Sequence, residues 1–418
     1  MSNKEYDSIP NEQKEYLGKA FDFENNTFNE NIAENEAFGK KEKIKILIAG
    51  ASGVGKSALI NAVFGDDIVD SGVGKPVTQQ LEKIIIPKKG LVLWDTKGIE
   101  SKDYKKTIKQ LKNDLKENFN NDEASSKFLS NLTSKILPNN SKIKDTLDLV
   151  WLCIDSNCSR FEGRDEELIK IINELNIPIV IVFTKSLGCD DNDFVNEVKS
   201  EVNKIIKNKV NFIPVNSIAR NVMGTTIPAF GINDLIDSSK EFLSEIKANA
   251  LNKAQEFDPK LKLAAMEEAA SIKVNFAVKA AGTAGLSPIP GSDAPLIAAI
   301  QSKMIYDINA EFELTSEEAH AIPVITGLLG MTALAQVGKS IVSNTLKLIP
   351  VGGSIVGGVV SGVTAAAITK AVGHAYIQVL KTRFNEETMK VELPDSTNSI
   401  LNLFKTYLQN ETTQPINL

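Results

Sequence analysis

A strand–loop–helix pattern near the N-terminus limits what this chain can fold into. The apolar run IKILIAG at 44–50 is rich in β-branched residues and ends in glycine, which predicts a buried strand. The residues GASGVGKS at 50–57 fit G-x-x-x-x-G-K-[ST], and SALINAVFG continues as a predicted helix. Glycines let such a loop wrap closely around a phosphate, with the amides of the helix N-terminus directed at it. The pattern therefore predicts a phosphate-binding loop.

Two side chains of this loop have distinct predicted tasks. Lys56 is expected to neutralise the β- and γ-phosphates of a nucleotide, and Ser57 to place its hydroxyl on Mg²⁺. The other residues bring backbone atoms to the phosphates. The predicted phosphate-binding residues are Gly50, Ser52, Gly53, Val54, Gly55, Lys56, Ser57 and Ala58.

A second motif follows after two predicted strands, LEKIIIP at 81–87 and GLVLWD at 90–95. The second strand ends in WDTKG, so Asp95 lies at its carboxyl end and Gly98 follows three residues later. In a D-x-x-G motif the carboxylate holds the Mg²⁺ shell and the glycine amide senses the γ-phosphate. The order of the motifs predicts a nucleoside triphosphatase.

With these motifs, residues 44–250 resemble a small GTPase domain of the Era/dynamin-like branch of P-loop GTPases. The resemblance implies an α/β fold, a Ras-like mostly parallel sheet with flanking helices, which binds GTP or GDP with Mg²⁺. Alternating predicted strands and helices agree with such a sheet. The resemblance makes Thr78 the switch I threonine that binds Mg²⁺ and γ-phosphate, and 96–104 switch II. It implies the metal-binding residues Ser57, Thr78 and Asp95 and the catalytic residues Lys56, Thr78 and Gly98.

Two later segments match the base-contacting motifs of that family. Thr184 and Lys185 end a predicted strand at 177–186 and match the start of an [NT]-K-x-D motif. The predicted strand at 210–218 ends near Ser217, which resembles the last base-contacting motif. The resemblance therefore implies that Thr184, Lys185 and Ser217 contact the base.

The sequence departs from the guanine motif at the position of its carboxylate. Leu187 stands where the residue that pairs with guanine N1 and N2 is expected, and it has no carboxylate. Asp190 or Asp191 could reach in from the loop. Guanine specificity thus follows mainly from the resemblance, and the use of ATP instead of GTP is an open alternative.

A second departure concerns hydrolysis. Ile99 follows the D-T-K-G sequence where many small GTPases carry a glutamine that orients water, and an aliphatic side chain cannot do so. We expect slow intrinsic hydrolysis, assisted by a partner, by dimerisation, or by Gln79 or Gln80. Arg160 and Arg164 lie near the expected phosphate edge, although surface ion pairing is the simpler interpretation of both.

The C-terminal half changes composition to Ala, Gly, Ile and Val. Residues 321–338 and 348–369 carry no charge, and each approaches the ~20 residues that span a bilayer. The second run contains two G-x-x-x-G spacings, which let helices approach closely. We expect membrane insertion or deep membrane contact; a hydrophobic helical bundle buried in protein would produce a similar pattern.

Residues 265–385 also resemble the YcjF-like hydrophobic domain of unknown function that often follows Era-type GTPase domains. The matching pieces are the IPGSDAP turn near 290, Gln301 with Met304, Lys347 with Pro350, and Gly373-His374-Ala375. In that family the domain is regarded as membrane-associated. The resemblance implies an all-α hydrophobic domain whose partner is membrane lipid, a second copy or another protein.

Charge and cysteine content exclude several classes of protein. The net charge is −6, which argues against a nucleic-acid binder, because phosphate backbones attract a basic face. With 2 histidines and 3 cysteines, a zinc site or a disulfide framework is not expected. The N-terminus carries no apolar secretory run, which favours the cytoplasm or the cytoplasmic side of a membrane. The Lys- and Asn-rich, Arg-poor composition is typical of an AT-rich bacterial genome.

These observations predict four regions: a mobile or helical arm at 1–42, a GTPase domain at 43–251 with a helical insertion near 102–146, a hydrophobic helical domain at 252–390, and a tail at 391–418 with an amphipathic helix. The leading functional hypothesis is a Mg²⁺-dependent GTP-binding and GTP-hydrolysing switch that changes the state of the helical domain. The alternative is a slow-turnover, nucleotide-loaded soluble scaffold that assembles protein partners.

Overall fold

The structure is a computed structural model of the chain, and it forms two compact units. One consists of residues 42–258, and the other combines 1–41 with 259–418. The described residues are 9–65, 68, 81–96, 147–158, 161, 163–188, 193–207, 209–283, 293–333 and 362–411.

A six-stranded sheet forms the centre of the unit 42–258, in the order β4-β5-β3-β6-β7-β8. All neighbouring strands are parallel except β4 and β5, which pair as antiparallel strands across a tight turn. The expected mostly parallel α/β sheet is confirmed. The strands are β3 Ile44–Gly50, β4 Leu81–Ile86, β5 Leu91–Thr96, β6 Leu149–Asp155, β7 Ile179–Thr184 and β8 Asn211–Pro214.

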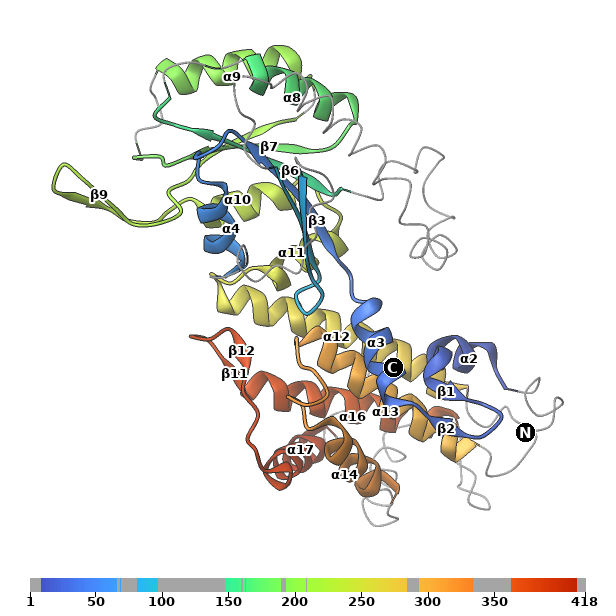
Figure 1. The fold of residues 1–418 in the computed structure, drawn as a ribbon. Helices are drawn as coiled ribbons and strands as arrows, with labels where there is room; N and C mark the ends of the chain where they lie inside the picture. Colours follow the sequence, from blue (N-terminus) through green and yellow to red (C-terminus); the bar gives the residue numbers. More distant parts are fainter. Residues whose placement is uncertain are drawn as a thin grey trace. The chain divides into compact units, whose positions relative to one another are not determined.

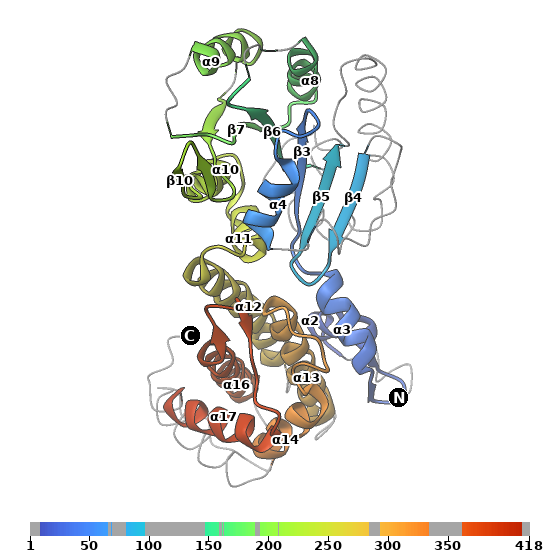
Figure 2. The same cartoon turned by 60° about the vertical axis from the view of Figure 1, so that its left-hand side comes forward.

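Helices cover both faces of this sheet (Figures 1 and 2). One face packs on α8 Gly163–Glu174 and α9 Asp193–Ile205, and the other on α4 Lys56–Phe64, α10 Ile232–Lys240 and α11 Glu245–Ala254. Alternate residues of β3 serve the two cores: Leu47 belongs to the first, whereas Ile46 and Ile48 belong to the second. The central strands are apolar throughout because both of their faces are buried.

Two features of this unit differ in detail from the sequence prediction. The residues 231–251, whose pattern predicts one helix, form the two helices α10 and α11. An antiparallel hairpin, β9 Arg220–Val222 with β10 Thr225–Ile227, follows β8 and stands away from the sheet in Figure 1. The predicted helical insertion at 102–146 lies outside the described residues.

The other unit is mainly helical, as expected for the C-terminal half. α12 begins at Pro259, a residue suited to the first turn because its missing amide hydrogen has no helical partner there. α12 and α16 approach closely at Gly373, where an added Cβ would lie 2.6 Å from a methyl group of Val274. The elements are α12 Pro259–Gly282, α13 Asp293–Glu311, α14 Ala321–Ala333, α16 Gly362–Thr382, β11 Phe384–Asn385, β12 Lys390–Val391 and α17 Thr397–Glu411.

The N-terminal segment 9–41 belongs to this helical unit, whereas the sequence suggested a separate arm. Its buried Leu17, Phe21 and Phe23 join the same hydrophobic core as α13 and α16. The segment docks through tertiary contacts. Its apolar residues are few, but they pack on helices α12 and α13, which lie far away in the sequence. The elements of the segment are α2 Asn11–Leu17, η1 Gly18–Ala20, β1 Phe21–Asp22, β2 Thr27–Phe28 and α3 Glu30–Gly39.

The two charge-free runs are only partly described. α14 contains the first residues of the run at 321–338, and α16 contains the end of the run at 348–369; residues 334–361 lie outside the described ranges. Among the described helices, none combines the length and the apolarity that crossing a membrane requires.

Candidate nucleotide-binding site

The glycine-rich loop joins β3 to α4 at the carboxyl end of the parallel strands. Gly50 has a φ of 145°, and a Cβ there would lie 2.3 Å from the carbonyl oxygen of Cys153. Gly55, the N-cap of α4, has a left-handed φ of 104°. Side chains are excluded at the first position by the neighbouring strand and disfavoured at the second by the backbone conformation. The two glycines therefore let the loop pass closely beside β6 and turn into α4 without a side-chain clash.

Lys56 lies at the first turn of α4 and folds back over this loop. Its side chain is buried, and its ammonium donates hydrogen bonds to the carbonyl oxygens of Gly50, at 3.2 Å, and Ala51, at 3.1 Å. Ser57, the next residue, is exposed. A positive charge, the helix N-terminus and an exposed serine thus meet in one loop, which suits a phosphate group and its counter-ion.

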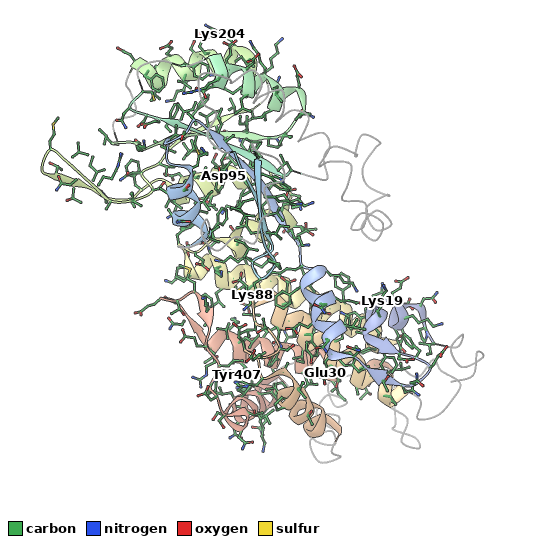
Figure 3. The ribbon with its side chains drawn as sticks, in the orientation of Figure 1. Lys19, Glu30, Lys88, Asp95, Lys204 and Tyr407 are labelled. Carbon is green, nitrogen blue, oxygen red and sulfur yellow. The ribbon has the colours of Figure 1, made fainter. Side chains whose placement is uncertain are left out.

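Asp95 approaches the same loop from β5, beside Ile48 of β3 (Figure 3). The pKa of the Cys153 thiol on β6 is affected by the charges of both Lys56 and Asp95. Burial raises the pKa of Cys153 to about 12, while the Lys56 charge lowers it and the Asp95 charge raises it. The opposing charges of Lys56 and Asp95 therefore act within one small region at the sheet edge.

The end of β7 is fixed directly to the phosphate-binding loop. The hydroxyl of Thr184 donates to the carbonyl oxygen of Val54 at 2.6 Å, and it also lies 3.2 Å from that of Ile154. A Cβ at Gly55 would lie 3.9 Å from Cε of Lys185. Thr184 and Lys185 thus lie against the phosphate-binding loop.

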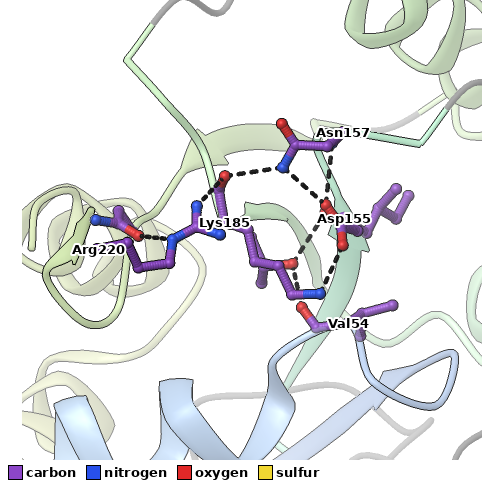
Figure 4. Close-up of polar contacts among 8 residues, drawn as sticks. Val54, Asp155, Asn157, Lys185 and Arg220 are labelled. Carbon is purple, nitrogen blue, oxygen red and sulfur yellow. Dashed lines mark hydrogen bonds and ion pairs between the residues drawn. The ribbon is translucent and has the colours of Figure 1, made fainter. Parts of the chain in front are cut away.

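Lys185 adopts a left-handed conformation, with a φ of 55°, and is held at both ends (Figure 4). Its ammonium lies 2.7 Å from Oδ2 of Asp155, and its carbonyl oxygen accepts hydrogen bonds from Nδ2 of Asn157, at 3.1 Å, and from Arg220. Burial alone would raise the pKa of Asp155, but hydrogen bonds from Lys185 and Asn157 lower it below its ordinary value. The carboxylate of Asp155 is therefore charged near neutral pH.

The loop after β8 completes the site. Asn216 is buried, and its side-chain amide donates to the carbonyl oxygen of Pro228 at 2.7 Å. Its side-chain oxygen accepts a hydrogen bond from Nε of Arg220 at 3.1 Å. Ser217 follows in the same loop and is half-buried, and Leu187 is 41% exposed.

The structure brings most of the sequence-predicted residues to one edge of the sheet. The loop residues Gly50, Ser52, Gly53, Val54, Gly55, Lys56, Ser57 and Ala58 lie there with Asp95, Thr184, Lys185 and Ser217. Thr78, Gly98, Asp190, Asp191 and Arg160 lie outside the described residues.

Three residues at this edge were not predicted from the sequence: Asp155, Asn157 and Arg220. The first could have been found, because Asp155 ends a predicted strand just as Asp95 does, and parallel strands end at the same sheet edge. Arg160 and Arg164 were the arginines expected near the phosphates, whereas Arg220 lies on a hairpin after β8 that the sequence pattern does not predict. Arg164 lies in the first turn of α8.

The oxygen donors at the loop fit a Mg²⁺ ion. The Ser57 hydroxyl lies in the first turn of α4, and the Asp95 carboxylate lies near the end of β5. Mg²⁺ prefers oxygen ligands, and phosphate and water would supply the other ligands of the ion. Thr78, the third expected ligand, lies outside the described residues.

Two protein families match separate parts of this chain. Residues 45–185 match the family described as 50S ribosome-binding GTPase, and residues 248–406 match a domain of unknown function designated DUF697. The first match spans β3 to the end of β7, including every described residue of the phosphate-binding loop. The second begins in α11 and ends in α17. No curated protein matches the chain.

Several solved structures are similar to part of the chain. The structure described as a probable GTP-binding protein EngB has 20% identity and a TM-score of 0.29, covering 47% of this chain and 97% of that one. Era of Aquifex aeolicus bound to GDP and AlF4⁻ has 18% identity and a TM-score of 0.31, covering 56% of this chain and 68% of Era. The cytosolic domain of the T. maritima FeoB iron transporter has 15% identity and a TM-score of 0.26, covering 64% and 98%.

Proposed function

The chain carries a P-loop GTPase domain followed by a C-terminal domain of unknown function, and we propose that it is a Mg²⁺-dependent GTP-hydrolysing switch. The observation that carries the proposal is the position of Lys56, whose ammonium is held over the phosphate-binding loop by two loop carbonyls. Asp95 approaches from one side, and Thr184 fixes the loop from the other. Phosphate, metal and base contacts would thus come from the ends of β3, β5 and β7, at one edge of the sheet.

Each residue has a separate task in this proposal. Lys56 and the loop amides bind the β- and γ-phosphates, and Ser57 with Asp95 holds Mg²⁺, which neutralises charge that develops on the phosphates. In this proposal Thr78 and the Gly98 amide contact the γ-phosphate in the GTP state and release it after hydrolysis. Because Ile99 cannot orient water, intrinsic hydrolysis is slow and depends on assistance from elsewhere.

Nucleotide binding tests the core of the proposal. Labelled GDP should bind the full chain, and Lys56→Ala should weaken binding by at least a hundredfold, since it removes the charge at the phosphates. Lys88→Ala is the matched control, because Lys88 lies in the β4–β5 turn at the opposite end of the strands. Competition by GTP and ATP distinguishes the nucleotides. Equal binding by wild type and Lys56→Ala would contradict the assignment.

Hydrolysis separates the switch from the scaffold alternative. Single-turnover release of phosphate should be slow but measurable in wild type, and absent in Thr78→Ala under the same conditions. Raising the protein concentration or adding vesicles should accelerate it if dimerisation or lipid supplies the missing assistance. A rate at background under all these conditions would favour the slow-turnover scaffold.

Coupling to the helical unit is supported by the chain connections. The GTPase unit is joined to the helical unit twice, between 41 and 42 and between 258 and 259, so a change in either connection acts on the helical unit. Hydrogen exchange in α12 and α3 should therefore differ between the GDP state and a state with a non-hydrolysable GTP analogue. Lys56→Ala should abolish that difference, and its persistence would contradict nucleotide coupling.

We also propose that the helical unit contacts membrane lipid at the cytoplasmic face. Ile272 and Phe276 lie one helical turn apart on α12 and are 47% and 52% exposed, which gives this helix a small apolar surface that lipid could cover. Flotation of the full chain with anionic vesicles tests this, with Phe276→Ser as the disrupted variant and the charge-neutral Asn275→Ser, at an exposed residue of the same helix, as its control. If no variant floats, a concentration-dependent change in mass would point to a homodimer or another protein partner.

A further inference from the structure

The β9–β10 hairpin delivers one arginine to the base end of the site. Arg220 is the first residue of β9, and its guanidinium joins two loops: Nε donates to the side-chain oxygen of Asn216, and a terminal nitrogen donates to the carbonyl oxygen of Lys185. Asn216 is itself fixed, because its side-chain amide donates to the backbone of β10 and the residue that follows it. A planar guanidinium can bridge two acceptors in this way, whereas an ammonium is a single point of contact.

The segment that Arg220 contacts has an unfavourable backbone conformation. Lys185 is not glycine, yet its φ of 55° lies in the left-handed region, which costs of order 1 kcal/mol. Two donors, Arg220 and Asn157, converge on the carbonyl oxygen of this residue, and Asp155 holds its ammonium. The conformation therefore depends on side chains from β6 and from the hairpin (Figure 4).

We propose that Arg220 is a positioning residue for nucleotide binding, which holds the segment 184–188 in the conformation that receives the base. The inference rests on the proposed nucleotide site. It follows from Leu187: a site without a carboxylate at that position lacks one strong directional contact with the base. The preformed backbone and the Lys185 side chain must then carry more of the base contact, so their orientation before binding affects affinity.

The experiment compares ligands with and without a base. Arg220→Ala should raise the Kd of GDP roughly tenfold, the effect of losing about one well-formed hydrogen-bonding group. The affinity for Mg²⁺-tripolyphosphate should stay within about twofold of wild type, because that ligand reaches only the phosphate-binding loop. In turnover, KM should rise while kcat at saturating GTP stays unchanged. A purely structural defect would weaken both ligands and lower the thermal midpoint.

Three further variants sharpen the test. Arg220→Lys should recover only part of the affinity, because it replaces one of the two hydrogen bonds. Thr226→Ala, an exposed residue on the same hairpin, should behave as wild type. Asn157→Ala and Arg220→Ala should be non-additive in GDP affinity, because both side chains donate to one carbonyl oxygen.

The outcomes separate this inference from the proposed function. If wild type binds neither GDP nor tripolyphosphate, the proposed function fails. If wild type binds both and Arg220→Ala binds GDP with the wild-type Kd, the positioning role of Arg220 is overturned while the nucleotide site stands. Equal loss of affinity for GDP and tripolyphosphate also overturns the role, since it would indicate a disturbance of the whole site.

Discussion

Two lysine–aspartate pairs, one in each unit, have nearly the same length and very different surroundings. Lys185 and Asp155 lie 2.7 Å apart at the edge of the sheet, with side chains 36% and 17% exposed. Lys303 and Asp307 lie 2.8 Å apart on α13, with side chains 3% and 7% exposed. The first pair is open to solvent and to a ligand, and the second is enclosed by the helical unit.

The enclosed pair also has a third partner from the start of the chain. The Tyr16 hydroxyl donates to Asp307 at 3.0 Å, and the Lys303 ammonium lies 5.0 Å from the centre of the Tyr16 ring. Removing one member of a buried ion pair leaves the other charge buried without a partner, which is strongly destabilising. At an exposed pair, water solvates the remaining charge, so the loss of stability is small. The α13 pair is therefore expected to matter more for the stability of its unit than the exposed pair at the sheet edge.

The largest expected effect comes from breaking the buried pair. Lys303→Ala leaves Asp307 charged and buried, and it should lower the free energy of unfolding of the helical unit by about 3–5 kcal/mol. Urea unfolding followed by circular dichroism at the helical signal measures this. Lys279→Ala, on the exposed face of α12, is the control and should change little.

A double variant distinguishes charge burial from lost packing. Made in a Tyr16→Phe background, so that no hydroxyl loses its acceptor, Lys303→Met combined with Asp307→Leu removes both charges while keeping apolar volume. It should recover much of the loss that Lys303→Ala causes in the same background. If the double variant is as unstable as the single one, the stranded charge is not the cause.

A smaller effect is expected at Tyr16. Tyr16→Phe removes a hydrogen bond to a charged acceptor and should cost about 1.5–3 kcal/mol of helical-unit stability. Burial, followed by the Asp307 charge and hydrogen bond, raises the pKa of Tyr16 above its ordinary value of 10.0. Wild type keeps this contribution below pH 10 and loses it as pH rises toward the folded-state pKa. The stability difference between wild type and Tyr16→Phe should therefore shrink in alkali; a constant difference would contradict the contact.

The contrast also explains which parts of the molecule could be predicted from the sequence. The phosphate-binding loop and the strands on either side are local patterns, since glycine at 50 and 55 and the β-branched run before them are needed whatever surrounds them. Asp95 follows from the same logic, because its strand end is marked by the residues next to it.

The helical unit depends on contacts that no local pattern contains. The polar residues Lys303 and Asp307 would be placed on an exposed face by their type, yet both are buried because they pair with each other and with Tyr16. The N-terminal segment has too few apolar residues to predict docking, since its partner surface is formed by α12 and α13. Arg220 escaped prediction for the same reason: one of its two acceptors, the carbonyl oxygen of Lys185, lies at the end of another strand, β7.

At the sheet edge, position 187 offers a way to add the missing directional contact. Leu187→Asp should raise the preference for GTP over ATP by about tenfold or more, equivalent to ~1.4 kcal/mol, because a carboxylate accepts from both guanine N1 and N2. Leu187→Asn, which keeps the size but lacks the charge, should raise it less. Competition binding measures the ratio. No change in either variant would indicate that the base lies away from Leu187.

The smallest expected effect tests the exposed pair itself. Asp155→Asn keeps the hydrogen bond from Asn157 but weakens the hold on Lys185, and it should change the stability of the GTPase unit by less than ~1 kcal/mol. The GDP affinity should fall by a few-fold, because Lys185 is then less well oriented. Urea unfolding followed by the fluorescence of Trp94 and Trp151, both within this unit, gives the stability, and GDP titration gives the affinity.

Acid supplies the matching test in wild type. The pKa of Asp155 is lowered below its ordinary value of 3.8, so the contribution of the pair to stability is present above that pH and is lost only as pH falls through the lower folded-state pKa. The difference between wild type and Asp155→Asn should therefore be constant from pH 7 to pH 5. A loss above 2 kcal/mol on substitution would instead group this pair with Lys303 and Asp307, and solvent exposure would no longer separate the two.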